Sequence, residues 1–147
     1  MSRIFYVLIA FVFFSGCGIS QQYVIHSPVA IGNPQRTGSV LFECEGPAES
    51  TDVIGHYIVI DNEPAIFVEA FSRLQVILAS GGHTFNIVSA AAHKKSFYKK
   101  GTVPDQDQVF PYGKSVMHSF YLVEGGSAVV RYHAPSKPDE QGELTVD

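Results

Sequence analysis

The chain is poor in the residues that usually mark catalysis or cross-linking. Its 147 residues include no tryptophan and only two cysteines, and charged side chains make up 16% of them. No two histidines have the HxxxH spacing and no GxSxG motif occurs, so the sequence encodes neither a zincin helix nor a nucleophile elbow. No apolar run approaches the roughly 20 residues that a membrane-spanning helix needs. The length suffices for one domain.

Positive charge is also scarce. Lysine and arginine total 10 against 14 acidic residues, which gives a formal net charge of −4 at pH 7. Domains that bind nucleic acid are usually basic, because they neutralise phosphates. We therefore expect no nucleic-acid partner.

The first residues have the organisation of a secretory signal peptide. Ser2 and Arg3 form a short positive region, residues 4–14 are an uninterrupted apolar run of eleven, and Ser15 and Gly16 are small. A run of this length is typical of a signal-peptide core and is too short to span a membrane. We expect residues 1–16 to be a signal peptide.

Cys17 comes directly after this segment, and Phe14-Ser15-Gly16-Cys17 resembles the lipobox of bacterial lipoproteins. The resemblance implies that the Cys17 thiol receives a diacylglyceryl group and that cleavage makes this cysteine the first residue. Two or more acyl chains form a stable anchor, since each buried CH₂ contributes about 0.8 kcal/mol. In such lipoproteins an aspartate after the cysteine implies retention in the inner membrane. Gly18 stands at this position here, so the resemblance implies that the protein is on the outer membrane with its domain facing the periplasm. The alternative is an ordinary secretory signal.

Beyond the signal peptide, composition divides the chain into three parts. We expect residues 17–36 to be the lipidated cysteine and a tether, residues 37–133 to be the folded domain, and residues 134–147 to be a disordered tail. Within the tether, residues 23–25 (YVI) are either a short edge strand or a partner contact. With lipid on Cys17, Cys44 has no partner for an internal disulfide, and we expect it to be a small buried hydrophobe.

Short strands separated by turn residues fill the predicted domain. The densest apolar alternation lies in residues 56–89, where Asp61-Asn62 and Gly81-Gly82 are turn formers. The expected strands are residues 37–44, 56–60, 65–68, 73–78, 83–89, 115–123 and 127–133, with a loop over residues 93–114. This spacing predicts an all-β fold, a single antiparallel β-sandwich of transthyretin-like or immunoglobulin-like type. A small closed barrel is the alternative.

Three segments carry a family resemblance: residues 57–62 (YIVIDN), 74–78 (LQVIL) and 81–85 (GGHTF). They resemble small bacterial β-domains in which an extended segment ends in Asp-Gly and Pro-Gly-x-His opens a later strand. PEGA-type domains and a family of uncharacterised lipoproteins have this pattern, and both are similar to transthyretin-like sandwiches. Here Asn62 replaces the glycine and Ser80 the proline. The resemblance covers roughly residues 37–133 and implies a non-enzymatic scaffold or interaction role in the cell envelope, with no catalytic residues and no cofactor.

Histidines provide the alternative function. Six are present, and His56 and His83 begin strands that could be neighbours, so that with Asp61 or Asp52 they would form a metal site or the base of a hydrolase. The competing interpretation is that each histidine caps a strand or bonds a turn. Two Ser–His neighbours, at 80/83 and 118/119, are close in sequence only.

The most distinctive surface feature is residues 94–100 (KKSFYKK). Four of the six lysines of the chain, Lys94, Lys95, Lys99 and Lys100, surround Phe97 and Tyr98. Such a basic and aromatic segment fits an anionic lipid or glycan surface, or an acidic envelope protein. A solvated loop whose lysines protect a sheet edge is the alternative.

Overall fold

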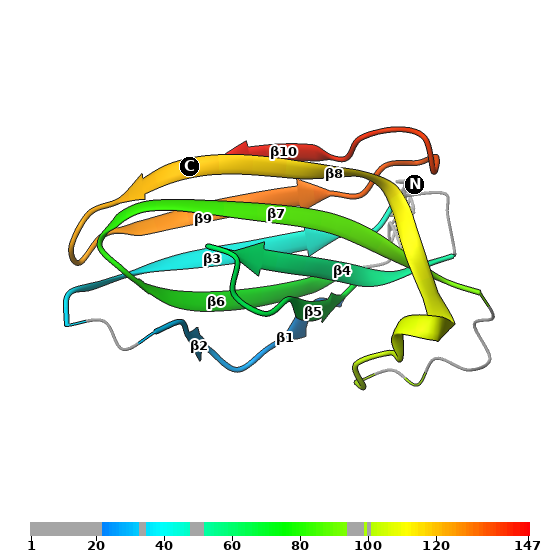
Figure 1. Ribbon diagram of the computed structural model, residues 1–147, viewed down its shortest axis with the longest axis horizontal. Helices are drawn as coiled ribbons and strands as arrows, with labels where there is room; N and C mark the ends of the chain where they lie inside the picture. The colour runs from blue at the N-terminus through cyan, green and yellow to red at the C-terminus, as the bar shows by residue number, and fades with distance from the viewer. Residues whose placement is uncertain (1–21, 33–34, 48–51, 94–98, 100) are drawn as a thin grey trace, which may run out of the picture.

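Two β-sheets packed face to face form the domain (Figure 1). A computed structural model describes residues 22–32, 35–47, 52–93, 99 and 101–147. Sheet A has the strand order β1-β6-β3-β9-β10, with β2 also paired to β6, and sheet B has the order β5-β4-β7-β8. The sandwich is thus confirmed, and the described residues form no closed barrel. The strands are β1 (Val24–Ile25), β2 (Val29–Ala30), β3 (Thr37–Glu45), β4 (Val53–Ile60), β5 (Ile66–Glu69), β6 (Ser72–Ala79), β7 (Gly81–Ala92), β8 (Val109–Leu122), β9 (Ser127–His133) and β10 (Glu143–Val146).

The chain changes sheets repeatedly. It passes from β3 in sheet A to β4 and β5 in sheet B, returns for β6, crosses again for β7 and β8, and ends with β9 and β10 in sheet A. β3 and β4, the first two long strands of the chain, therefore lie in different sheets.

The sequence predicted antiparallel strands throughout, but some strand pairs are parallel. β3 lies parallel to β9 in the middle of sheet A, with Phe42 opposite Val130. β1 and β2 also run parallel to β6. Parallel neighbours need a long connection, and the excursion of the chain through sheet B between β3 and β9 provides it.

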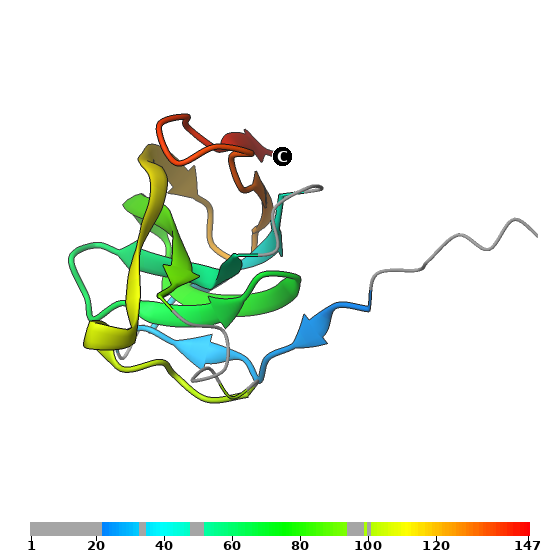
Figure 2. The same ribbon diagram turned by 90° about the vertical axis from the view of Figure 1, so that its right-hand side faces the viewer.

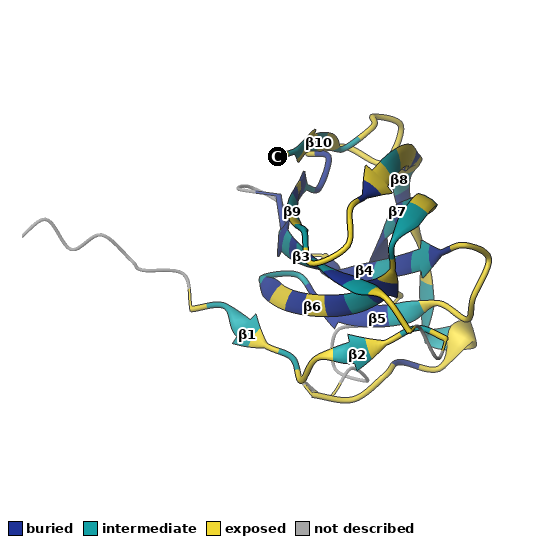
Figure 3. Cartoon of the chain, turned by 90° about the vertical axis from the view of Figure 1, so that its left-hand side faces the viewer, coloured by how far each residue is buried: buried dark blue, intermediate teal, exposed yellow. Residues whose placement is uncertain are grey.

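Buried and more exposed residues alternate along the strands, as the colouring of β6 shows (Figure 3), and the buried ones form the core. Leu74, Val76 and Leu78 of β6 are buried, as predicted, and so are Phe85 and Ile87 of β7. Along β3 every second residue is buried and along β6 buried and more exposed residues also alternate, because successive side chains of a strand point to opposite faces. The rings of Phe42 and Phe85 meet edge-on at 5.4 Å and connect the two sheets.

The predicted turn after β4 is confirmed. Asp61 and Asn62 have positive φ angles of 49° and 62°, and the N–H of Glu63 donates to the carbonyl of Ile60. Asp and Asn tolerate this left-handed conformation better than most residues.

The described segments on either side of the predicted domain contain more strand than the sequence suggested. Residues 23–25, left open as strand or partner contact, include β1, and β2 lies further along the predicted tether. Residues 134–147 were expected to be a disordered tail, but Ala134 is buried and β10 pairs with β9. Leu144 and Val146 pack on the core, and this burial offsets the cost of ordering the segment.

The segment after β7 also differs from expectation. Residues 109–114 were expected to be loop, yet they are the first half of β8, opposite the last residues of β7. Residues 90–92 are the last residues of β7, and they pair with β4 on one side and with β8 on the other. A short 3₁₀ helix at Gln106–Gln108 precedes β8.

The sandwich has two distinct ends. At the end that we call proximal, Cys44 lies opposite both Ser72 and Tyr132, and Ala91 lies opposite Val53 and Phe110. The distal end carries the turns from β4 to β5, from β6 to β7 and from β8 to β9. β1 joins β6 at the proximal end (Figures 1 and 2).

Candidate functional site

A chain of buried polar groups crosses the core near the proximal end. His56 on β4 and Ser89 on β7 are opposite each other, and Nδ1 of His56 lies 3.1 Å from Oγ of Ser89. Oγ of Ser89 is 3.0 Å from the hydroxyl of Tyr132 on β9, in the other sheet. Nε2 of His56 is 3.1 Å from the carbonyl oxygen of Ala70. Three strands and the turn between β5 and β6 therefore meet in one hydrogen-bonded chain.

The directions of these bonds follow from the acceptor at one end. A carbonyl oxygen only accepts, so Nε2 of His56 carries the proton and donates to Ala70. Nδ1 then accepts from the hydroxyl of Ser89, which in turn accepts from Tyr132. Burial lowers the pKa of His56 to about 4, so the ring is neutral at pH 7, although the bond to Ala70 acts in the opposite direction.

The Ser89–His56 pair resembles a serine nucleophile with its base, but it is enclosed. Both residues are 0% exposed. The hydroxyl that would attack a substrate is already bonded on both sides. The arrangement satisfies buried polar groups and stabilises the packing of the two sheets. Sequence reasoning missed the pair because its members are 33 positions apart.

The two histidines proposed for a metal site do not meet. His56 lies opposite Ser89 of β7. His83 precedes Ser89 by six residues on the same strand, and six residues of a strand span about 20 Å. Asp61 does lie beside His83, with Nδ1 and Oδ2 separated by 2.5 Å. Nε2 of His83 is 2.7 Å from the carbonyl of Ala79, so this histidine fastens the turn between β6 and β7 to Asp61.

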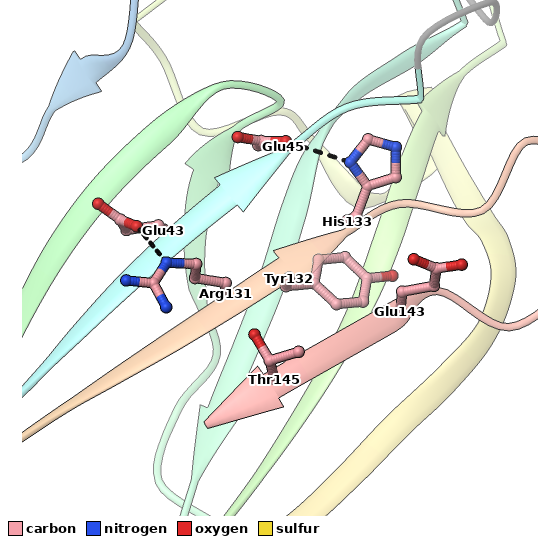
Figure 4. A pocket seen from close by; sticks show the side chains of 7 residues that line it. All are labelled: Glu43, Glu45, Arg131, Tyr132, His133, Glu143 and Thr145. Atoms are coloured by element: carbon pink, nitrogen blue, oxygen red, sulfur yellow. Dashed lines mark hydrogen bonds and ion pairs between the residues drawn. The ribbon is translucent and has the colours of Figure 1, made fainter. Parts of the chain in front are cut away.

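A cluster of charged side chains covers the outer face of sheet A at the proximal end (Figure 4). Glu43 accepts from Nε of Arg73 at 3.0 Å and from Nε of Arg131 at 3.1 Å. Nδ1 of His133 lies 3.2 Å from the carboxylate of Glu45. A hollow of about 190 Å³ lies beside Glu43, Glu45, Arg131 and His133, and Tyr132, Glu143 and Thr145 also line it.

Glu45 is the centre of this cluster because its carboxylate also accepts a hydrogen bond from the hydroxyl of Tyr23, in the N-terminal segment. This bond lowers the pKa of Glu45, with a smaller contribution from His133, although partial burial opposes it. The same bond raises the pKa of Tyr23 to about 12. Opposite charges are thus paired within the cluster. Within the described ranges, no group of three or more His, Cys, Asp or Glu side chains is arranged to hold a metal ion.

The outer face of sheet B has a different chemistry. Met117 and Tyr121 of β8, and Val123 directly after it, are 70%, 76% and 60% exposed. β8 is the edge strand of its sheet, and β7 is its only strand partner among the described residues. Three large exposed apolar side chains therefore follow one another in sequence around the distal end of β8.

Most of the predicted binding residues lie outside the described part of the chain. These are Cys17 and, within the basic segment, Lys94, Lys95, Phe97, Tyr98 and Lys100. Lys99 is described and is exposed. Cys44 is buried as predicted, and its burial raises the thiol pKa to about 12. No helix in the described ranges is long and apolar enough to cross a membrane.

Comparison with known proteins finds no relative: no family model, curated protein or solved structure matches the chain. The described residues define a β-sandwich whose two sheets have 4 and 6 strands.

Proposed function

We propose that this protein is a lipid-anchored, non-enzymatic module of the bacterial cell envelope that acts as a structural or protein-interaction domain. In this proposal Cys17 carries the lipid and the protein sits on the outer membrane, facing the periplasm. The PEGA-like and transthyretin-like resemblance of residues 37–133 is part of the same proposal.

The observation that supports it most is where the folded domain begins. Tyr23 is already bonded to Glu45 and Val24 is already paired with β6, six and seven residues after Cys17. The sandwich therefore follows the proposed lipid site almost directly. A folded domain that begins so few residues after its lipid stays close to the membrane surface, which suits a structural or binding role there.

Two further features favour a structural or binding role over a reaction. The hydrogen-bonded Ser89–His56 pair is buried in the core, and His56 and His83 are too far apart for a shared metal ion at about 2.0–2.1 Å from each. By contrast, Met117, Tyr121 and Val123 around the distal end of β8 offer exposed apolar area, which is typical of contact surfaces when it is grouped.

Metabolic labelling with palmitate tests the anchor. The protein should carry the label and sediment with membranes, and Cys17→Ser should lose both. Cys44→Ser is the matched control, because the buried Cys44 thiol is not available to a lipidating enzyme. A Cys17→Ser protein that remains fully on the membrane would overturn the anchor.

A further inference from the structure

The N-terminal segment at residues 22–32 is bound along the exposed side of β6. The N–H groups of Val24 and His26 donate to the carbonyls of Phe71 and Arg73, and the N–H of Ile31 donates to that of Ile77. These contacts extend over most of β6, from its first residue towards its distal end. We call residues 22–32 the strap.

Side chains hold the proximal end of the strap. The hydroxyl of Tyr23 donates to Glu45, and the guanidinium of Arg73 lies 4.6 Å from the centre of the Tyr23 ring. Nε2 of His26 lies 2.5 Å from the carboxylate of Glu69, which is only 8% exposed. Releasing His26 would leave this buried carboxylate without that partner, which is unfavourable. The strap is therefore part of the sandwich.

The strap limits how far the domain can turn on its anchor. Gln22 is five residues after Cys17, and five residues span at most about 18 Å. β8 alone has 14 residues, which corresponds to about 45 Å in a strand. If the strap were free, the first fixed residue would be Thr37, and the 20 intervening residues could reach about 70 Å. Only the bound strap keeps one end of the sandwich close to the lipid.

We infer that the strap orients the domain, so that the proximal end and the β6 side face the lipid bilayer while the distal end of β8 points away from it. This inference rests on the proposed lipid anchor at Cys17. The segment around residues 101–108 lies on the same side of the sandwich as β2 (Figure 2), so it faces the bilayer in this orientation. It includes Val103, which is 71% exposed. The exposed apolar side chains around the distal end of β8 face the periplasm.

Two valines form a matched pair for the test. Val103 and Val123 are similarly exposed, at 71% and 60%, but Val123 directly follows the distal end of β8. Val103→Cys and Val123→Cys would each carry a fluorescent label in the full-length lipidated protein. Cys44 is buried and its thiol pKa is about 12, so it reacts poorly. The labelled proteins would be reconstituted in phosphatidylglycerol-containing vesicles whose lipid headgroups carry a nitroxide quencher.

The expected result is quenching severalfold stronger at position 103 than at position 123. Equal quenching at the two positions, or stronger quenching at 123, in protein that is lipidated and membrane-bound would overturn the orientation but not the anchor. Absence of lipid on Cys17 would overturn both.

Proline substitutions then test the strap itself. Val24→Pro combined with His26→Ala removes one backbone donor to β6 and the partner of Glu69. In this double variant the ratio of quenching at position 103 to quenching at position 123 should approach one, while the protein stays on the vesicles. Ile25→Pro is the matched control. The N–H of Ile25 lies between the two donating N–H groups of Val24 and His26 and points away from β6, and proline is tolerated at such a position. If the double variant remains folded by thermal denaturation and keeps the full ratio, the strap does not set the orientation.

Discussion

The rings of His56 and Tyr132 meet edge-on, with their centroids 5.2 Å apart and their planes at 82°. His56 belongs to sheet B and Tyr132 to sheet A, and both bond to Ser89. The contact thus holds the two sheets together through a histidine that must remain neutral. This requirement couples the stability of the fold to pH.

We expect acid to destabilise the protein through His56. Because burial lowers the pKa of this histidine from 6.5 to about 4, the folded state binds its proton less readily than the unfolded state does. The contribution of the neutral ring is complete above about pH 6.5 and is lost as the pH falls towards 4. A difference of this size corresponds to a loss on the order of 3 kcal/mol. Urea denaturation at a series of pH values measures it.

Two variants separate His56 from other titrating groups. His56→Gln keeps an amide that can donate to Ala70 but does not titrate, so its stability should depend less on pH between 6.5 and 4. His118→Asn, a change at an exposed histidine of β8, should leave the pH dependence as it is in the unmodified protein. An identical acid response in all three proteins would show that His56 is not the responsible group.

The close approach of β5 to Gly55 in β4 predicts a second effect. At Gly55, an added Cβ would lie 2.3 Å from the carbonyl oxygen of Val68 and 2.4 Å from the ring of Phe67. Gly55→Ala should therefore force β4 and β5 apart and cost about 1–3 kcal/mol or more, as overpacking does. Gly82→Ala is the control, since no atom lies within 4 Å of its Cβ position. Thermal denaturation of the two variants should show a clear decrease in Tm for Gly55→Ala alone.

The sequence predicted the faces of the central strands well, because alternation at Leu74, Val76 and Leu78 reports directly which side is buried. It could not predict which strands are neighbours. The parallel pairing of β3 with β9 joins residues 88 positions apart, such as Glu43 and Arg131, and nothing in the local pattern encodes it. The buried chain of His56, Ser89 and Tyr132 was missed for the same reason.

The C-terminal segment was mispredicted for a different reason. Its apolar residues, Leu144 and Val146, do alternate with polar ones, but only over four residues, and Pro135 and Pro138 precede them. So short a pattern is stable only when a neighbour supplies the other half of the pairing, which β9 does here.

Removing this segment should therefore be costly. A variant that ends at His133 loses β10, together with the packing of Leu144 and Val146 on the core. Full burial of one such side chain is worth about 1.5–3 kcal/mol, so two partly buried ones predict a loss of about 2–4 kcal/mol. A disordered tail could be removed at no cost. Lys137→Ala, at a side chain that is 70% exposed, should change the free energy of unfolding by less than about 0.5 kcal/mol.

The basic segment predicts a salt-dependent interaction. Lys94, Lys95, Lys99 and Lys100 should attract anionic headgroups or an acidic partner at about 1 kcal/mol each near the surface. The test uses a soluble form that begins at Gly18, so that the lipid anchor does not contribute. Its binding to phosphatidylglycerol vesicles should weaken as salt rises, since the screening length falls to about 8 Å at 0.15 M ionic strength. Co-sedimentation at increasing salt concentrations measures the effect.

Changing all four of these lysines to glutamine should abolish vesicle binding while leaving the Tm nearly unchanged, because exposed charges contribute little to folding. The matched control is the double variant Lys114→Gln and Lys137→Gln, which removes two exposed lysines elsewhere and should keep most of the binding. If the quadruple variant binds as the unmodified protein does, the segment at residues 94–100 is a solvated loop. The four lysines would then serve to keep a sheet edge from pairing, as such residues commonly do.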